Sequence, residues 1–369
     1  MATKSNNKIS VAMVANNLEI NGISSVIMNY CTHINLDEFE ICIMAGSGIA
    51  ECHRITCEKL GITVIELPNR KKDSMNYFRA LDKSLRKRHF DIIHVHGNQS
   101  AIAIELFLGW KNGIKVRIAH SHNTTCMSMK LHKLLKPAFN MIYTDGFACG
   151  KEAGKWLFGN KPFTVIPNGF NIELFKYDET ARKLVREELG VDNKLVLGNI
   201  GRINDQKNQP FLLEIFSEVG KINKDAVLLL VGTGPREAEI KELINQHPYK
   251  NRIIMYGETT SPEKMYSAMD YFVFPSKYEG LPVTVLEAQI SGLSCVLSDV
   301  ITQEVVINEN VQKVPLDASP AIWANQIIHL SMINRECVLD SSDELKKYSI
   351  NNASSILENA YLTALDKRN

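Results

Sequence analysis

The chain has 369 residues, of which 45% are hydrophobic and 22% are charged, a balance that is typical of folded globular proteins and excludes disordered and fibrous chains. Its 42 basic and 41 acidic side chains nearly cancel, so the overall charge does not indicate a protein that binds nucleic acid. No apolar run approaches the roughly 18 residues of a membrane span, and the polar N-terminus lacks a signal-peptide pattern. The eight cysteines have no zinc-binding or redox spacing, so we expect reduced thiols in a cytoplasmic protein.

Short strand-like runs alternate with helical patterns along the chain. The first half contains predicted strands at Ile9–Ala15, Glu40–Ala45, Thr63–Leu67, Asp91–Val95, Val116–Ala119, Gly146–Ala148 and Thr164–Ile166. The second half contains predicted strands at Leu195–Ile200, Ala226–Val231, Arg252–Tyr256, Tyr271–Phe274 and Ser294–Leu297. Helical patterns of about 10–15 residues between such strands are typical of parallel sheets. The sequence therefore predicts an α/β protein with two doubly wound, Rossmann-like domains.

A boundary between the domains is expected at residues 166–170, where Pro167 and an Asn-Gly pair interrupt regular structure. We assign residues 1–170 to an N-terminal domain, 171–345 to a C-terminal domain and 346–369 to a C-terminal helix. Parallel sheets bind ligands at the carboxyl ends of their strands, so two such domains facing each other would share one cleft. The loops that follow the strands are therefore where functional side chains are expected.

The clearest candidate segment is residues 274–287, which leaves a strand, turns, and enters a helix. Backbone N–H groups at the start of a helix lack intrahelical partners and suit a phosphate. The candidate N–H and contact positions are Gly280, Leu281, Pro282 and Val283. Glu279 and Glu287 could accept hydrogen bonds from sugar hydroxyls in the same cleft. Alternatively, Glu279 is a capping acid and Glu287 is a solvated helix residue.

A second candidate segment follows the first strand of the C-terminal domain. There the chain turns at Gly201 and carries Arg202 and, five residues later, Lys207. Two cations at a strand end suit a diphosphate, although such a pair is also common on surfaces. In the next strand-to-helix turn, Gly232 and Gly234 would permit close approach of a ligand, but the third glycine of the dinucleotide-binding motif is missing.

The N-terminal domain offers weaker candidates. Gly22 follows the first strand and either admits a ligand beside the next helix or only forms the turn. His94 is expected to pack within the sheet. His120 and His122 form a His-x-His at a strand end, and we expect them to point to opposite faces, so that one of the two faces the cleft. No metal site is predicted, because no second cluster of Asp, Glu, His or Cys at ligand spacing accompanies this pair.

Together these segments resemble the retaining glycosyltransferases of family 4, across essentially the whole chain. That family has the GT-B fold, two Rossmann-like domains with the active site between them. The resemblance rests on the order and spacing of four segments, which read IPNGF, GRINDQK, VGTGP and EGLPVTVLE. It implies that Arg202 and Lys207 neutralise the donor diphosphate, that Glu279 contacts the transferred sugar or phosphate region, and that Glu287 binds the nucleotide ribose. The implied catalytic residues are thus His120, His122, Arg202, Lys207 and Glu279.

The remaining features of the resemblance are looser. RIAHSHN occupies the place of a cleft-facing histidine in the family, and the tail resembles the closing helix that packs on the first domain. The frequent Gly-Gly of the first loop is Asn21-Gly22 here, which leaves Gly22 as the donor-binding candidate.

The implied reaction moves a hexosyl unit from a nucleoside diphosphate sugar, with UDP the expected nucleotide, to a hydroxyl group with retention of anomeric configuration. The resemblance implies no metal and no cofactor. The acceptor would be a saccharide, lipid-linked, in the assembly of capsule, exopolysaccharide or a related glycan. Two alternatives stay open: a non-hydrolysing sugar-nucleotide epimerase, and a non-catalytic nucleotide-binding partner of an assembly complex.

Charge suggests where the acceptor binds. Residues 1–172 carry 21 basic and 13 acidic side chains, a net charge of +8, whereas residues 173–369 carry 21 and 28, a net charge of −7. Basic clusters in the first half lie at residues 70–72, 86–88 and 130–136. Lysines mixed with leucines suit an anionic membrane surface, although each cluster could also be a solvated face. We therefore expect a cytoplasmic protein held peripherally on the inner face of the cell membrane.

Overall fold

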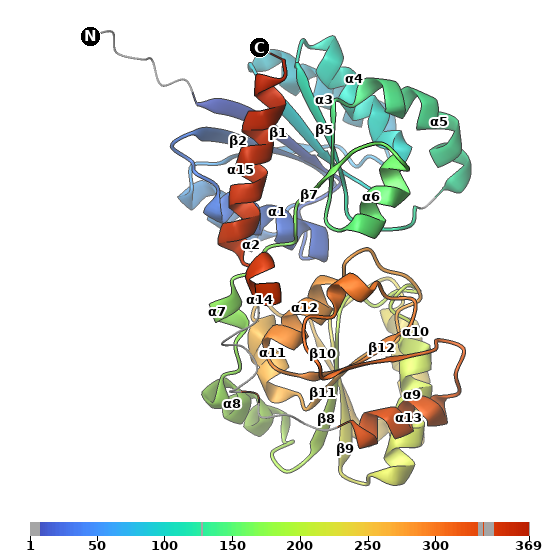
Figure 1. Cartoon of the computed structure of the whole chain (residues 1–369). Helices are drawn as coiled ribbons and strands as arrows, with labels where there is room; N and C mark the ends of the chain where they lie inside the picture. The colour runs from blue at the N-terminus through green and yellow to red at the C-terminus, as the bar shows by residue number, and fades with distance from the viewer. Residues whose placement is uncertain (1–7, 127, 331–334, 336–342, 369) are drawn as a thin grey trace. The chain divides into compact units, whose positions relative to one another are not determined.

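The computed structural model describes residues 8–126, 128–330, 335 and 343–368. They divide into two compact units, each built around its own sheet (Figure 1). The N-terminal unit contains the described residues up to Gly169 together with those from Lys347 onward, and the C-terminal unit runs from Phe170 to Lys346.

The sheet of the N-terminal unit has seven strands, all parallel, in the order β3-β2-β1-β4-β5-β6-β7. These strands are β1 Ile9–Ala15, β2 Phe39–Gly46, β3 Thr63–Leu67, β4 Ile92–His96, β5 Val116–Ser121, β6 Asp145–Ala148 and β7 Thr164–Val165. The central strand β1 is buried along most of its length, which explains why its sequence is almost entirely apolar. The neighbouring strand β4 is buried throughout although it carries His94 and His96. The direction of strand order reverses between β1 and β4, the position at which such sheets bind ligands.

Three of the described helices in this unit begin at side chains that cap their free N–H groups. Asn21 accepts from the N–H of Ser24 at α1, Asp73 caps α3 and Ser128 caps α5 in the same way. The helices are α1 Gly22–His33, α2 Glu51–Lys59, α3 Ser74–Lys87, the 3-10 turn η1 Ser100–Ile102, α4 Ala103–Lys111, α5 Met129–Ile142, α6 Lys151–Phe158 and, from the other end of the chain, α15 Ile350–Asp366. α15 packs against α1 (red and blue in Figure 1), so the last helix belongs to this unit.

The sheet of the C-terminal unit has six parallel strands in the order β10-β9-β8-β11-β12-β13. They are β8 Leu195–Ile200, β9 Ala226–Val231, β10 Ile253–Gly257, β11 Tyr271–Phe274, β12 Ser294–Ser298 and β13 Val311–Val314. The helical elements between and around them are α7 Ile172–Phe175, α8 Glu179–Leu189, α9 Gln209–Ile222, α10 Glu237–Gln246, η2 Lys250–Arg252, α11 Pro262–Ala268, α12 Val283–Ile290, η3 Gln303–Val305, α13 Pro320–His329 and α14 Asp343–Lys347. Here the strand order reverses between β8 and β11.

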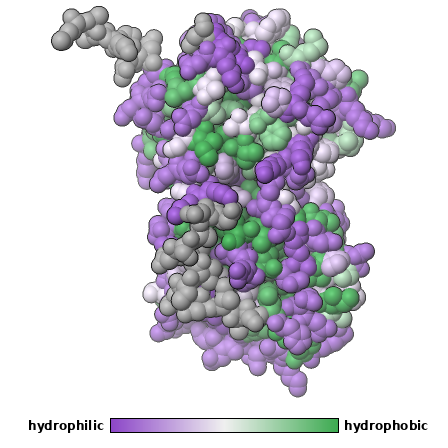
Figure 2. Space-filling view, in the orientation of Figure 1, coloured by the Kyte–Doolittle hydropathy of each residue, from purple (hydrophilic) through white to green (hydrophobic). Residues whose placement is uncertain are grey.

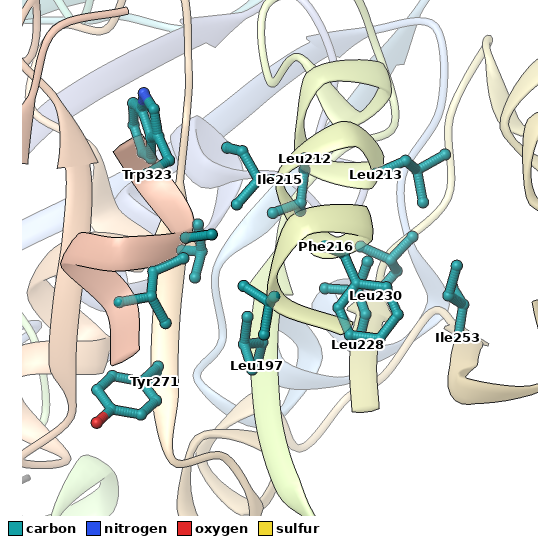
Figure 3. Close-up of a cluster of buried hydrophobic side chains, with 14 of the residues drawn as sticks. Leu197, Leu212, Leu213, Ile215, Phe216, Leu228, Leu230, Ile253, Tyr271 and Trp323 are labelled. Carbon is teal, nitrogen blue, oxygen red and sulfur yellow. The ribbon is translucent and has the colours of Figure 1, made fainter. Parts of the chain in front are cut away.

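One face of this sheet is covered by α9, whose apolar side chains recur at helical spacing. Figure 3 shows Leu212 and Phe216 of α9 directed toward Leu228 of β9, with Trp323 of α13 beside the helix. All four side chains are fully buried. Since burial of one large apolar side chain stabilises a fold by about 1.5–3 kcal/mol, this cluster holds the strand ends of the unit in place.

The predicted α/β class with two doubly wound units is confirmed, with two differences in detail. β13 is absent from the predicted strands, because VQKV is short and half polar, as suits the outermost strand of a sheet. The C-terminal helix assigned to residues 346–369 corresponds to α15, Ile350–Asp366, and the short helix α14 precedes it. Within the described part of the chain, no helix combines the length and apolar character needed to cross a bilayer. The visible face is largely hydrophilic, with separate hydrophobic patches (Figure 2).

Candidate active site

The loops after β8 and β11 meet at the point where the strand order of the C-terminal unit reverses. Nζ of Lys207 lies 2.8 Å from Oε1 of Glu279, and these side chains are only 14% and 8% exposed. The same ammonium group lies 4.4 Å from the centroid of the Phe274 ring. Two residues 72 positions apart, chosen separately from the sequence, thus form one ion pair. Because both charges are largely withdrawn from water, each charged group is stabilised by its partner, and removal of one would leave the other as an uncompensated buried charge.

Hydrogen bonds to backbone carbonyl groups hold the two loops together around this pair. The N–H of Lys277 donates to the carbonyl of Gln206 at 2.9 Å, and the Gln206 amide donates to the carbonyl of Tyr278 at 2.9 Å. Asn208, in the left-handed conformation at the start of α9, donates to the carbonyl of Pro275 at 3.2 Å. The ion pair therefore sits on a rigid frame.

Arg202 lies in the same loop as Lys207 but is exposed. Its carbonyl accepts from the side chain of Gln209 at 3.2 Å, which fixes the backbone beneath it. Its guanidinium group forms no hydrogen bond or ion pair with any of the residues that the structure describes. Arg202 thus presents an exposed positive charge, without a described partner, on the loop that also carries Lys207.

The glycines of this region have a structural role that the sequence did not reveal. A Cβ on Gly232 would lie 2.2 Å from the carbonyl oxygen of Gly201, and one on Gly234 would lie 2.2 Å from that of Ile203. The N–H of Ile203 also donates to the carbonyl of Thr233 at 2.8 Å. Close packing of the loops after β8 and β9 therefore explains why glycine is required at both positions. A role of the two glycines in binding the donor stays a prediction.

The start of α12 carries free backbone donors, as the sequence led us to expect. Pro282 occupies the cap position, no side chain caps the helix, and no acidic residue lies in its first turn. Among the described residues, the N–H groups of Gly280, Val283 and Thr284 have no acceptor. The hydroxyl of Thr284 is buried and likewise lacks a described partner. Such a helix start favours an anion through its free N–H groups and its dipole.

Glu287 of α12 is buried, so the alternative of a solvated helix residue is wrong. Its Oε2 accepts a 2.8 Å hydrogen bond from the hydroxyl of Tyr266 on α11. Burial raises the pKa of Glu287 to about 7. The hydrogen bond from Tyr266 and the charge of Lys207 oppose this increase, whereas the charge of Glu263 adds to it. No sequence pattern pointed to Tyr266, which reaches Glu287 only because α11 packs on α12.

The N-terminal unit gathers four histidines at the carboxyl ends of β4 and β5, which we call the histidine quartet: His94, His96, His120 and His122. Within each strand the rings stack face to face, with centroids 4.2 Å apart for the β4 pair and 4.1 Å apart for the β5 pair. Between strands they meet edge to edge: His94 Nε2 lies 3.0 Å from His120 Nδ1, and His96 Nδ1 lies 2.9 Å from His122 Nε2. The expectation that His120 and His122 point to opposite faces is therefore wrong, because residues i and i+2 of a strand share a face.

The quartet is buried and electrically neutral. Burial is the main cause that lowers the pKa of His94 and of His122 to about 3, and burial together with the neighbouring imidazoles holds the pKa of His96 and His120 well below the usual range. Two nitrogens, Nε2 of His96 and Nε2 of His120, are buried without a described partner. Buried polar atoms in native proteins are rarely left in this way, so these two mark a place for a ligand or water.

Part of the quartet also has the spacing of a metal site. Candidate ligand atoms of His94, His96 and His120 lie within 4.8 Å of one another. The expectation that no second cluster accompanies the His-x-His pair is wrong, because β4 and β5 are neighbours and bring a second pair of histidines alongside the first. However, His94 and His120 already share a hydrogen bond through two of the nitrogens that a metal would need.

Gly22 begins α1, and a Cβ there would meet no atom within 4 Å. Among the residues that the structure describes, no steric requirement explains this glycine. Its assignment to the donor site stays a prediction.

Comparisons with known proteins identify the family. The family described as glycosyl transferases group 1 matches residues 181–350, which include the ion pair and α12. The chain is also 31% identical to EpsF of Bacillus subtilis (strain 168), assigned as a glycosyltransferase, over 261 residues that make up 67% of each chain. The chain belongs to the group 1 glycosyl transferases.

Further comparisons agree with a group 1 glycosyl transferase. Over 243 residues the chain is 28% identical to the UDP-Gal:α-D-GlcNAc-diphosphoundecaprenol α-1,3-galactosyltransferase of Escherichia coli, a match that covers 60% of this chain and 61% of that protein. The crystal structure of Anabaena HepE in complex with UDP and glucose superposes with a TM-score of 0.74 at 17% identity, covering 97% of this chain and 98% of that one. The predicted GT-B fold is thereby confirmed. The protein is a glycosyltransferase, and its relatives do not support the epimerase alternative.

Proposed function

We propose that this glycosyltransferase moves a hexosyl unit from a UDP-sugar to a hydroxyl group of a lipid-linked saccharide, with retention of configuration, in the assembly of a capsule, exopolysaccharide or related glycan. The observation that carries the proposal is the Lys207–Glu279 pair, which lies in the loop system that also contains Arg202 and the uncapped start of α12. The name of the Escherichia coli relative, which states a UDP-sugar donor and a diphosphoundecaprenol-linked acceptor, supports the choice of substrates.

The chemistry required is stabilisation of a departing diphosphate. Cleavage of the bond between the sugar and the diphosphate builds negative charge on the leaving oxygens. Lys207, Arg202 and the free N–H groups at Gly280 and Val283 would offset that charge from fixed positions, and preorganised donors of this kind are usually the largest contribution to catalysis. Glu279 holds the Lys207 ammonium group 2.8 Å away and so determines where that charge is presented.

These same groups make a divalent metal unnecessary for the proposed reaction. A metal ion in phosphate chemistry chiefly neutralises charge on the leaving oxygens. Two side-chain cations and a helix start provide that neutralisation here, so we propose a metal-independent enzyme without a cofactor.

Glu287 is proposed to bind the ribose of the nucleotide. Tyr266 occupies one of its two carboxylate oxygens, and the other remains to accept from a ribose hydroxyl. In the N-terminal unit, His120 and His122 are proposed to contact the transferred sugar or the acceptor hydroxyl. Burial keeps both imidazoles neutral by lowering the pKa of each, so each would act as a hydrogen-bonding group and not as a cation.

We further propose that the N-terminal unit rests on an anionic membrane through α4 and α5, which pack side by side. Both helices expose apolar side chains that are normally buried, among them Trp110 at 55%, Leu134 at 74% and Met141 at 84%. Lys130 and Lys133 are exposed on α5, whereas the Lys136 ammonium group turns back to the carbonyl of Leu157. Exposed apolar residues with lysines between them suit the surface of an anionic bilayer, where a lipid-linked acceptor would be found.

The test uses the full chain with UDP-, GDP- and ADP-sugars, EDTA and a membrane lipid extract, and measures release of nucleoside diphosphate together with sugar incorporated into lipid. We expect turnover of one UDP-sugar, with Lys207→Ala and Glu279→Ala each lowering it by about a hundredfold or more. Lys277→Ala is the matched control, because Lys277 lies in the same loop system but pairs with the exposed Asp205 at 2.7 Å. Nucleotide binding without turnover of any donor would favour the non-catalytic alternative.

A further inference from the structure

Tyr361 of α15 stands at one end of a line of hydrogen bonds through the histidine quartet. Its hydroxyl lies 2.6 Å from Nδ1 of His94, and Nε2 of His94 lies 3.0 Å from Nδ1 of His120. The His94 and His120 rings are within 10° of coplanar with centroids 5.1 Å apart, so the two imidazoles meet edge to edge with their lone pairs and N–H bonds in line. All three side chains are fully buried, and the line ends at the unpartnered Nε2 of His120.

The direction of these hydrogen bonds follows from the proton inventory of the groups. A neutral imidazole has one N–H and one accepting nitrogen, and a phenol has one proton to donate. The Tyr361 hydroxyl is the better donor of its pair and the His94 nitrogen the better acceptor, and 2.6 Å is a distance typical of an O–H donor. With Nδ1 of His94 accepting, the proton of that ring is on Nε2 and is donated to Nδ1 of His120. The proton of His120 is then on Nε2.

The opposite direction of these hydrogen bonds has a higher free energy. If His94 donated from Nδ1 to Tyr361, the phenolic proton would have no acceptor among the described residues, inside the core of the unit. His120 would then donate from Nδ1 and leave a bare lone pair on its buried Nε2. A buried donor and a strong acceptor would both be unsatisfied, and each such group carries a desolvation penalty.

We propose that Tyr361 and His94 are positioning residues that hold His120 in the tautomer with its proton on Nε2, ready to donate to an oxygen of the substrate. The identity of that oxygen rests on the proposed function, but the tautomer does not. The last helix of the chain therefore acts on the candidate site without contact with substrate. His120 would serve as a neutral hydrogen-bond donor, and a role as the base that removes the acceptor proton is excluded for it.

The first readout is the tautomer itself. Two-bond ¹H–¹⁵N spectra of the labelled full chain, without any substrate, should show both His94 and His120 protonated on Nε2. In Tyr361→Phe the line has no donor at its end and can run in either direction, so both residues should show averaged Nδ1 and Nε2 signals. Tyr30→Phe is the matched control, because Tyr30 is equally buried in the same unit but donates to the carbonyl of Pro167 at 2.8 Å.

We call the line of hydrogen bonds from Tyr361 through His94 to His120 the relay. A second pair of variants separates the effect of these hydrogen bonds from the effect of side-chain packing at His94. The amide of His94→Gln offers an oxygen to Tyr361 and an N–H to His120, so His120 should keep its proton on Nε2. His94→Leu fills the space without either group and should give the averaged signal. Under the transfer assay, Tyr361→Phe and His94→Leu should lower kcat by about tenfold, the effect of one neutral hydrogen bond, with KM within about twofold, while His94→Gln stays near the native rate.

The outcomes distinguish this proposal from the proposed function. A His120 tautomer that Tyr361→Phe leaves unchanged would overturn the relay, whatever the enzyme transfers. An averaged tautomer with an unchanged kcat would overturn its role in the reaction. Altered tautomers in a protein that turns over no donor would leave the relay in place and count against the proposed function alone.

Discussion

The hydroxyl of Tyr266 donates a 2.8 Å hydrogen bond to Oε2 of Glu287, within the C-terminal unit. The bond joins α11 to α12 and gives a buried carboxyl group its one described hydrogen-bond donor. It stabilises the ionised form of Glu287 but not enough to offset burial, which raises the pKa of this group to about 7. Glu287 is therefore poised to change charge near neutral pH, and this has a measurable effect on stability.

Glu287→Gln should change how the free energy of unfolding depends on pH. The pKa of Glu287 is about 7 in the folded protein against an ordinary 4.5, so its contribution to stability is fully present below pH 4.5 and is lost as the pH rises toward 7. Between pH 5 and pH 8 the native protein should lose about 2–3 kcal/mol that the variant keeps, because a tenfold difference in proton affinity corresponds to about 1.4 kcal/mol. Urea denaturation at the two pH values measures the difference.

Glu218→Gln is the control for that comparison, since Glu218 forms an ion pair with Lys221 near the surface. It makes the same change of side chain near the surface and so controls for the general effect of removing one carboxylate. Equal pH dependence of native protein and Glu287→Gln would show that Glu287 ionises normally in the folded state.

Lys207 and Glu279 should be coupled in stability as well as in activity. Removal of either partner leaves the other as a largely buried charge, so each single alanine variant should lower the free energy of unfolding by about 2–3 kcal/mol. The double variant should cost less than the sum of the two, with a coupling energy of about 1–2 kcal/mol. Denaturant unfolding of the four proteins gives that energy; strict additivity would mean that the pair is not formed in solution.

Gly232→Ala should destabilise the C-terminal unit for a reason unrelated to ligands. Gly232 has φ of +128°, and its new Cβ would lie 2.2 Å from the carbonyl oxygen of Gly201. We expect a loss of roughly 3 kcal/mol or more, which thermal unfolding without ligand would detect. Gly61→Ala has φ of +69° but open space around the new Cβ, so it should cost only about 1 kcal/mol. Equal costs would mean that the loops after β8 and β9 are not closely packed.

The exposed apolar residues of α5 should determine binding to anionic membranes. Leu134→Asp and Met141→Asp each place a charge where an apolar side chain would enter the bilayer, so the fraction of protein that floats with anionic vesicles should fall severalfold. Leu184→Asp is the matched control, because Leu184 is 61% exposed on α8 of the other unit. Binding that is unchanged by both α5 variants, or reduced equally by the control, would count against this surface.

Much of the fold was predictable because its signals are local. Short apolar strands that alternate with helices indicate a parallel sheet, whichever apolar residues form the strands. All predicted strands are present, with ends that differ by a few positions at most. The turn at Gly280 and the helix behind it were likewise readable, since proline and glycine restrict the backbone where they stand. β13 was missed because an edge strand is half exposed and carries no continuous apolar run.

The candidate site was predictable only as separate residues. Motif spacing singled out Lys207, Glu279, Glu287 and the pair of histidines at the end of β5, one segment at a time. The ion pair spans 72 positions, and the contact of Tyr361 with His94 spans 267, so no pattern along the chain contains them. The prediction that His120 and His122 point to opposite faces was wrong, because residues i and i+2 of a strand lie on the same face. The stacking of their two rings shows this directly.

By itself, the amino-acid sequence determined the class of the protein: two Rossmann-like units, a loop with two cations, a helix start suited to a phosphate, and a family of glycosyltransferases. The tertiary structure decided which charged groups contact one another, which of them are buried, and which protonation state each adopts. It buried Glu287 beside Tyr266 and so raised its pKa, and it carried the last helix back to the first unit, where Tyr361 reaches His94. The physical reason is that proton affinity and hydrogen-bond direction depend on neighbours in space, and those neighbours are assembled only when the sheets and helices pack.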